Sequence, residues 1–174
     1  MSTCLMATGR KLPCKDVVGG IRTVYFADYG TLGTLTITAG TLTAISGSGT
    51  NFYKYEVKGG NNLEQTITSS DDNGTTFYGQ TVTAVLTKMD VATQVEIQKI
   101  VSQRPHVFIE DNNGNYFAVG LTRGCNVNGT ISTGTAMGDM NGYTLTITAE
   151  EPIMAPFVTS TVVTLHASPT QITP

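Results

Sequence analysis

One helical segment interrupts a chain that otherwise has the sequence patterns of β-strands and tight turns. The segment covers residues 90–103 and reads D-V-A-T-Q-V-E-I-Q-K-I-V-S-Q. Asp90 is a suitable N-cap, because its carboxylate can accept hydrogen bonds from the free N–H groups of the first turn. Pro105 prevents the helix from continuing. Ile97 and Ile100 lie on one helical face, but the segment is rich in β-branched residues, which have modest helix propensity. We therefore expect one short helix that is held by packing against a sheet.

Strand patterns fill most of the remaining chain. The clearest is Tyr143–Glu150, in which apolar side chains alternate with threonines, so that one face of the strand is apolar. Asn113-Gly114 and Asn141-Gly142 predict tight hairpins, since both residues of an Asn-Gly pair accept the positive φ of a type I′ turn. A glycine at position 79 predicts a β-bulge within a long strand. The predicted strands are Ile21–Tyr29, Thr34–Thr38, Thr41–Ile45, Phe52–Lys58, Leu63–Thr68, Thr75–Lys88, His106–Asp111, Asn115–Val119, Arg123–Asn128 and Tyr143–Glu150.

These elements predict a mainly β protein, an antiparallel β-sandwich or barrel with one short packed α-helix. The folded domain is expected to span residues 21–150. Residues 1–20 contain Pro13 and the pair Gly19-Gly20, and we expect them to form an N-terminal arm. Residues 151–174 combine prolines with apolar residues, which predicts an extended C-terminal arm that contacts a neighbouring subunit. An edge strand that folds back on its own domain is the alternative, and the sequence does not decide between the two.

The composition favours a surface that other subunits cover. Of the 174 residues, 30 are threonine, whose branched side chain is stiff and suits a strand. Charged residues make up only 13% of the chain, well below the usual proportion in soluble domains. A surface so poor in charge favours self-assembly over a free monomer. A threonine-rich secreted domain would have a similar composition and is the alternative.

The net charge and the apolar segments exclude several classes of partner. The net charge is −3, so the chain has no basic field that would attract nucleic acid. No apolar run approaches the ~20 residues that cross a bilayer, and we expect no membrane anchor. The N-terminus, M-S-T-C-L-M-A-T-G-R-K, lacks the continuous apolar core of a signal peptide. We expect the protein to be made in a cytoplasm and kept there until it is assembled.

The three cysteines, Cys4, Cys14 and Cys125, do not form a metal-binding pattern. Zinc sites usually contain a close cysteine pair, whereas the first two cysteines are ten positions apart. We expect reduced thiols. A disulfide between Cys4 and Cys14 that closes the N-terminal arm is one alternative. A metal site that includes His106 or His166 is the other, although we interpret both histidines as structural.

The sequence contains no catalytic motif. It lacks the phosphate-binding, dinucleotide-binding and zinc-protease patterns, and the G-S-G at 47–49 does not complete a nucleophile elbow. The paired acids at 71–72 and 110–111 adjoin Asn-Gly turns. We interpret them as turn formers rather than as calcium ligands or glycosidase acids. We therefore expect no enzyme activity, no metal and no cofactor.

The candidate functional residues are apolar side chains at expected subunit contacts. The strand at 52–58 reads F-Y-K-Y-E-V-K and has an aromatic face, which favours an interface. The C-terminal tail contributes further apolar residues. The predicted assembly interface comprises Phe52, Tyr53, Tyr55, Val57, Ile153, Phe157, Val162 and Leu165.

Two segments of the C-terminal half resemble structural proteins of tailed bacteriophages. They read R-P-H-V-F-I-E-D-N-N-G-N-Y-F-A-V-G at 104–120 and T-G-T-A-M-G-D-M-N-G-Y-T-L-T-I-T-A-E-E-P at 133–152. C-K-D-V-V-G-G-I at 14–21 is similar to the opening of the same group. The resemblance covers about residues 85–155. The order of elements also resembles the tail-tube fold, which has a β-sandwich or barrel, one flanking helix and a long hairpin used in ring formation.

This resemblance implies a structural protein of the virion that is assembled in the host cytoplasm. Subunits would form a homo-oligomeric ring, hexameric or larger, whose inner strands join across subunits, and DNA would pass only transiently through the lumen. Ring contacts are expected in residues 46–62, and contacts between rings in residues 1–20 and 151–174. Other tail or capsid proteins would be the partners. Deletion of 151–174 is then expected to leave a folded domain that does not stack.

A second class of particle protein shares these sequence features. A capsid-associated decoration or auxiliary protein, or a head-fibre base protein, would use the same threonine-rich sandwich as a clamp on capsid subunits. Such a protein would bind empty heads, whereas a tube protein would not. An adhesin is disfavoured by the N-terminal sequence, and a carbohydrate-active enzyme by the absence of Trp, the commonest sugar-stacking residue.

Overall fold

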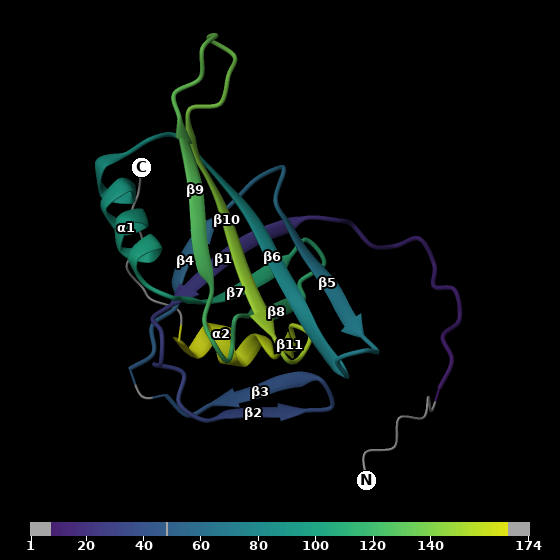
Figure 1. The fold of residues 1–174 in the computed structure, drawn as a ribbon. Helices are drawn as coiled ribbons and strands as arrows, with labels where there is room; N and C mark the ends of the chain where they lie inside the picture. The colour runs from purple at the N-terminus through teal and green to yellow at the C-terminus, as the bar shows by residue number, and fades with distance from the viewer. Residues whose placement is uncertain (1–7, 48, 167–174) are drawn as a thin grey trace.

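The protein folds as two β-sheets that pack face to face as a sandwich (Figure 1). The computed structural model describes residues 8–47 and 49–166. Neighbouring strands are antiparallel except for one parallel pair, β3 and β11. The expected mainly β fold is confirmed, and it is an open sandwich rather than a closed barrel.

The larger sheet has the strand order β2 (Leu35–Thr38), β3 (Thr41–Ile45), β11 (Phe157–Val158), β8 (Tyr116–Val119), β7 (His106–Asp111), β1 (Ile21–Ala27) and β4 (Tyr53–Glu56). The smaller sheet has the order β5 (Asn62–Ser70), β6 (Thr75–Thr87), β10 (Gly142–Glu151) and β9 (Asn126–Ser132).

The main core lies between the two sheets. Every second side chain of β10 points into it, so that the intervening threonines point out of the sandwich. The alternation predicted for this strand is therefore confirmed. The core includes Val24 and Phe26 of β1, Val107 and Ile109 of β7, Val82 and Ala84 of β6, and Leu145 and Ile147 of β10.

A second core lies on the opposite face of the seven-stranded sheet. Tyr25 of β1 and Phe108 of β7 pack there with Phe52 and with Leu42 of β3. The central strands are thus buried on both faces, and such strands have continuous apolar sequence in place of alternation. This burial explains why the strand predicted at 21–29 alternates only partly. The strand itself ends at Ala27.

The helix expected at 90–103 is present as α1 (Val91–Ser102). The Asp90 carboxylate accepts hydrogen bonds from the N–H groups of Ala92 at 3.0 Å and Thr93 at 3.2 Å, which confirms the predicted N-cap. Ile97 is buried in the main core, and Ile100 packs against it. Tertiary packing therefore holds a segment of modest helix propensity, as predicted.

The turn at Asn113-Gly114 joins two strands but is not of type I′. Gly114 has a φ of 81°, whereas Asn113 is not among the described residues with positive φ. The N–H of Gly114 donates to the carbonyl of Asp111 at 3.2 Å, and the N–H of Asp111 donates to the carbonyl of Asn115 at 2.9 Å. This is a type I turn followed by a glycine bulge. The Asp111 carboxylate also accepts from the N–H groups of Asn113 and Asn115, which confirms that this acid is a turn former.

Two further glycine predictions are wrong. The connection between β9 and β10 is the long loop 133–141, and Gly142 is already the first residue of β10, so no tight hairpin forms at Asn141-Gly142. Glycine is required at 142 for another reason, because a Cβ there would collide with the carbonyl oxygen of Leu86. Gly79 pairs with β5 on one side and β10 on the other in continuous register, without the predicted bulge.

The extended C-terminal arm predicted for 151–174 is wrong for its described part, residues 151–166. β11 inserts between β3 and β8, and an unpredicted helix, α2 (Ser160–His166), covers the second core (Figure 1). Val158, Val162 and Val163 are buried there, and the removal of their apolar area from water favours the folded-back conformation. This segment therefore adopts the alternative, a terminal strand that returns to its own domain.

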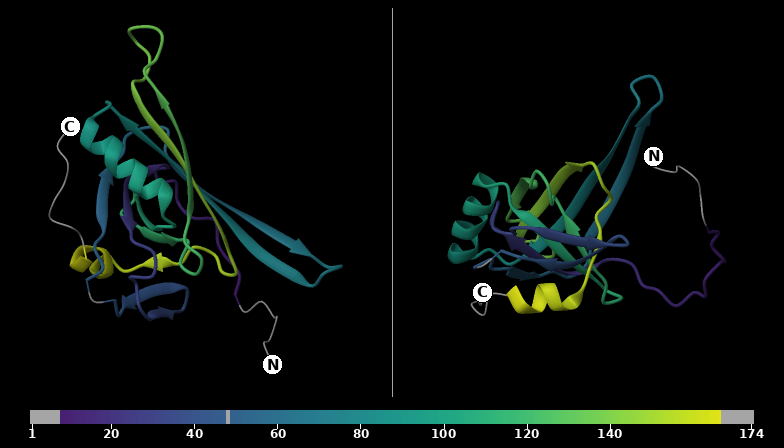
Figure 2. Two further views of the ribbon diagram at one scale, coloured as in Figure 1. Left: turned by 60° about the vertical axis from the view of Figure 1, so that its left-hand side comes forward. Right: turned by 90° about the horizontal axis from the view of Figure 1, so that it is seen from below.

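The N-terminal arm predicted for residues 1–20 is described from residue 8, and it leaves the body as an extended segment (Figure 2). Its base is fastened to the β7–β8 turn. The Asn113 side chain accepts from the N–H of Val18 at 2.8 Å and donates to the carbonyl of the same residue at 2.7 Å. Asn112 donates to the carbonyl of Gly19 at 2.7 Å. The arm therefore has a fixed origin on the domain.

Candidate assembly surfaces

Three of the predicted interface residues are buried in the cores. Phe52 is fully buried and stacks on Phe108, with ring centroids 4.5 Å apart. Val57 belongs to the main core and Val162 to the second core. Their assignment to a subunit interface is therefore wrong, because a partner reaches them only if the domain opens.

The remaining predicted residues lie on two separate parts of the surface. Tyr53 and Tyr55 of β4 line a groove beside α1, and Tyr53 is 38% exposed. Ile153 and Phe157 are 42% and 50% exposed where the chain passes from β10 into β11. Strands β8, β7 and β1 separate β11 from β4, so the two groups do not form one patch. The side chain of Leu165 lies outside the described residues.

The outer face of the four-stranded sheet is polar and almost uncharged. One cross-strand row runs Asn62, Thr83, Thr146, Asn128, and the next row contains Thr81 and Thr148. Its only charged members are the glutamates of β5 and β10. We call this surface the threonine face. It comprises Asn62, Glu64, Thr66, Thr68, Phe77, Thr81, Thr83, Val85, Asn126, Asn128, Thr130, Thr144, Thr146, Thr148 and Glu150. Phe77, which pairs with Thr68 and is 38% exposed, and Val85 are its apolar members.

Among the described residues, neither edge of the four-stranded sheet has a hydrogen-bonded neighbour, although α1 contacts β9. β5 pairs only with β6, and β9 pairs only with β10. Each of the three strand pairs is antiparallel, so β5 and β9 run in opposite directions. If copies are related by rotation about an axis along the strands, β5 of one copy beside β9 of the next continues the antiparallel alternation. The unpaired N–H and C=O groups of such edges can bind another chain.

The far half of the β5–β6 hairpin projects from the body (Figure 2). β10 pairs with β6 only between Tyr78 and Thr87, so the end of the hairpin has no third strand. Ile67 pairs with Tyr78, the last residue of β6 that β10 reaches, and it is 62% exposed, although it lies on the sheet face that is buried in the core farther along β5. An uncovered two-stranded ribbon is marginally stable by itself. The hairpin therefore presents apolar surface and a free strand edge to a partner.

A buried polar network joins the end of β10 to neighbouring segments. Oε1 of Glu151 accepts from the N–H groups of Thr122 at 3.0 Å and Arg123 at 3.1 Å, while Oε2 is buried with no hydrogen-bond partner among the described residues. Oε1 of Gln80 accepts from the N–H of Gly120 at 3.1 Å. These contacts fix the path of the backbone around residues 120–123. We assign the network a structural role.

Both histidines take part in packing. His106 is buried, and its two ring nitrogens contact backbone groups of Gly30 and Gly120. Burial lowers the pKa of His106 below its ordinary value. The carbonyl of His166 accepts the N–H of Phe52 at 2.7 Å. These positions agree with the interpretation of both histidines as structural.

Among the described residues, no group of three or more His, Cys, Asp or Glu side chains has an arrangement suited to a metal ion. Cys14 is exposed on the arm, and Cys125 is buried, which raises the pKa of its thiol. The alternative disulfide involves Cys4, which lies outside the described residues. In the part of the chain that the structure covers, no helix has the length and apolar character needed to span a membrane.

Comparisons of the chain with protein families, with curated proteins and with solved structures gave no match. The candidate surfaces therefore rest on the geometry alone.

The sequence pattern of β5 showed its two faces, but its position at a sheet edge depends on which strands pair with it. That pairing leaves no local signal in the sequence.

Proposed function

We propose that this protein is a structural component of a bacteriophage tail, where copies of it join into rings or a tube. The two open edges of the four-stranded sheet support the proposal most directly. Edge strands favour aggregation of a monomer, and a closed ring removes them by pairing each edge with the next copy. The resemblance of residues 104–120 and 133–152 to tailed-phage structural proteins points to the same function.

The antiparallel sense of the four strands makes such a ring geometrically simple. A seam between β5 and β9 of adjacent copies has the same sense as each pair within the sheet. Every copy contributes four strands, and the sheet closes on itself when the rotation closes. The seam also brings the threonine faces of successive copies into one continuous surface. In this proposal the ring contacts move from residues 46–62 to β5, β6 and β9.

The composition of the threonine face suits the lining of a DNA conduit. Lysine and arginine would neutralise phosphates and retain the DNA, and the threonine face has neither. Its charged residues are Glu64 and Glu150, which repel phosphate. Hydroxyl and amide groups keep the surface hydrated. DNA would therefore pass without a lasting contact.

The projecting hairpin and the arm account for contacts beyond the seam. A neighbouring copy that covers Ile67 would remove its apolar surface from water and support the two-stranded ribbon. The arm at residues 8–17 and the exposed side chains of Ile153 and Phe157 remain available for contacts between rings. Under this proposal the protein belongs to the virion and is assembled in the host cytoplasm.

A variant of the projecting hairpin tests the proposal. Ile67→Lys places a charge in the expected contact between copies but leaves the cores untouched, so the variant should fold normally and fail to assemble. Ile37→Lys is the matched control, since this isoleucine is also exposed but lies on β2 of the other sheet. Sedimentation velocity reports assembly, and thermal unfolding reports the fold.

Equal assembly by Ile67→Lys and the wild type would contradict the proposed contact. If the wild-type chain stays monomeric and binds purified empty heads, the capsid-associated function replaces the tail function. The same preparation therefore decides between the two classes of particle protein.

A further inference from the structure

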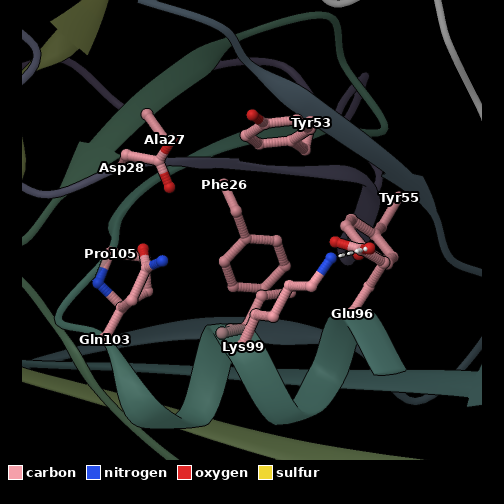
Figure 3. A pocket seen from close by; sticks show the side chains of 10 residues that line it. Phe26, Ala27, Asp28, Tyr53, Tyr55, Glu96, Lys99, Gln103 and Pro105 are labelled. Carbon is pink, nitrogen blue, oxygen red and sulfur yellow. Dashed lines mark hydrogen bonds and ion pairs between the residues drawn. The ribbon is translucent and has the colours of Figure 1, made fainter. Parts of the chain in front are cut away.

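A groove lies between α1 and the edge strand β4 of the larger sheet (Figure 3). Its volume is about 390 Å³. Phe26, Tyr55 and Ile100 supply apolar lining, Asp28 and Glu96 bring carboxylates to it, and Lys99 brings one amine. The groove thus combines an apolar surface with acidic groups, which suits a short segment that carries both apolar and basic side chains.

Of these two carboxylates, that of Asp28 is available to a partner, whereas that of Glu96 is already paired. Glu96 is bound to Lys99 of the same helix, with Nζ and Oε1 2.6 Å apart (Figure 3). The ion pairs formed among the described residues do not include Asp28. Burial, with Glu96 adding to it, raises the pKa of Tyr55 to about 12, so its phenol stays neutral and can donate a hydrogen bond. A basic segment in the groove would meet an unpaired acid.

The N-terminal arm has the complementary chemistry and no contact of its own. Leu12 is 98% exposed, and hydrogen bonds between the described arm and the body begin only at Val18. Arg10, Lys11 and Lys15 form none of the ion pairs found among the described residues. Residues 8–17 hold three basic side chains and one acidic one, whereas the rest of the chain holds seven basic and twelve acidic ones. Charge therefore favours contact between an arm and a body.

The arm does not lie near the groove of its own domain. In every view it leaves the body on the side away from α1 (Figures 1 and 2). Its base is held at Val18 and Gly19 by two asparagines of the β7–β8 turn. A second copy of the chain can offer its arm to the groove without any change at this base.

We propose that the groove beside α1 binds the N-terminal arm of a second copy, with Leu12 against the half-buried side chains of Tyr55 and Ile100 and with Arg10 and Lys11 beside Asp28. The inference rests on the proposed function only in requiring that two copies meet, and it needs no closed ring. The apolar contact supplies most of the affinity, because exposed ion pairs contribute little. Asp28, which forms none of the ion pairs found among the described residues, favours a basic arm and helps to orient it.

Disulfide trapping in the full chain tests this contact. Cys14 lies two positions after Leu12 and is exposed, so it can act as a natural probe on the arm. Gln103→Cys places a second thiol in the lining of the groove. Cys4→Ser removes the other N-terminal thiol, and Cys125 is buried with a raised pKa, which keeps it unreactive. Gln98→Cys is the matched control, because it is exposed on the same helix and does not line the groove.

The expected product is a covalent dimer formed by Gln103→Cys under mild oxidation, and lost when Cys14→Ser is added. Gln98→Cys should give at least fivefold less dimer. Equal yields from the two positions, no dimer from either, or a disulfide within one chain would each overturn the proposal. Because trapping reports a pair of copies, it can succeed when rings fail to form, and Ile67→Lys should leave it unchanged.

Two further substitutions test the chemistry of the contact. Leu12→Asp should lower the rate of trapping about tenfold or more, since it removes the apolar anchor. Asp28→Lys should lower the rate about two- to fivefold, and adding Lys11→Asp should restore it. Restoration separates a direct charge contact from a defect in folding. Failure of the double variant to recover, with circular dichroism unchanged, would contradict the assigned orientation.

Discussion

The Nε2 atom of His106 accepts a hydrogen bond from the N–H of Gly30 at 3.2 Å, and its Nδ1 atom lies 2.6 Å from the carbonyl oxygen of Gly120. Because an accepting ring nitrogen carries no proton, these contacts assign the proton to Nδ1, which donates it to Gly120. Tyr29 stacks on the ring with centroids 5.3 Å apart. One neutral histidine thus fastens the loop after β1 to the end of β8.

This arrangement predicts a loss of stability in weak acid. Burial is the largest cause of the lowered pKa of His106, and it outweighs the opposing effects of the Gly120 carbonyl and of Glu151. The unfolded state, with a pKa of about 6.5, therefore takes up a proton before the folded state does. The contribution of neutral His106 to the free energy of unfolding is complete above about pH 6.5. It is lost as the pH falls through the pKa of His106 in the folded state. Urea unfolding between pH 5 and 8 measures it.

His106→Gln supplies the comparison for this prediction. Glutamine has no titration in this range, so the variant should be less stable at neutral pH but should lose less stability between pH 7 and 5 than the wild type. The loss of the two backbone contacts should cost about 1–3 kcal/mol at neutral pH. Parallel curves for the two proteins would show that His106 does not cause the pH dependence.

Glu151 should contribute strongly to stability despite its charge. Its Oε1 accepts two backbone N–H groups, of Thr122 and Arg123, in a buried position. Glu151→Ala leaves both donors buried without a partner and should destabilise the fold by about 1.5–3 kcal/mol. Glu150→Ala, at the exposed neighbour, should change stability by less than about 0.5 kcal/mol. Similar losses in both variants, measured by urea unfolding, would contradict the role of the network.

The C-terminal segment should behave as part of the core. Val163 is 1% exposed, and Val163→Ala should cost about 1–3 kcal/mol through lost burial and a residual cavity. Thr161→Ala on the exposed face of α2 is the control. Deletion of 151–174 should therefore unfold the domain or destabilise it severely, contrary to the separate arm expected from its sequence. A deletion variant with the wild-type unfolding midpoint is the result that excludes this account.

Gly142 should tolerate no side chain. The carbonyl oxygen of Leu86 occupies the space of a Cβ at this position, so Gly142→Ala must push β10 away from β6 and should cost about 1–3 kcal/mol. Gly138→Ala is a control in the preceding loop, where a Cβ meets no atom within 4 Å. Thermal unfolding distinguishes the two, and an unchanged midpoint for Gly142→Ala would show that the sheet adjusts without loss.

The sequence predicts local structure well where one cause determines it. β3 and β7 have the predicted bounds, and Asp90 caps the single helix of the central domain. The alternation in β10 also predicts its inward face. Pairing between distant strands is less accessible, because β11 reaches β3 across more than a hundred residues of sequence. β11 has only two residues, Phe157 and Val158. Two apolar residues are equally compatible with a short strand and with an exposed apolar arm.

The candidate site was harder to predict for the same reason. Strand alternation places Phe52 and Val57 on opposite faces, and each points into a different core, because the edge of the sheet is covered on both faces. Ile67 belongs to an alternating strand whose inner face is covered only near the body. Which apolar residues stay exposed depends on the lengths of the neighbouring strands, and no local pattern contains this information.

Electron microscopy of the full-length chain, concentrated stepwise to the millimolar range, tests the central claim most directly. The account predicts rings or tubes with a central channel, whose wall is continuous because β5 of each copy pairs with β9 of the next. Chains that stay monomeric across the whole concentration range, or that associate without a channel, would contradict it.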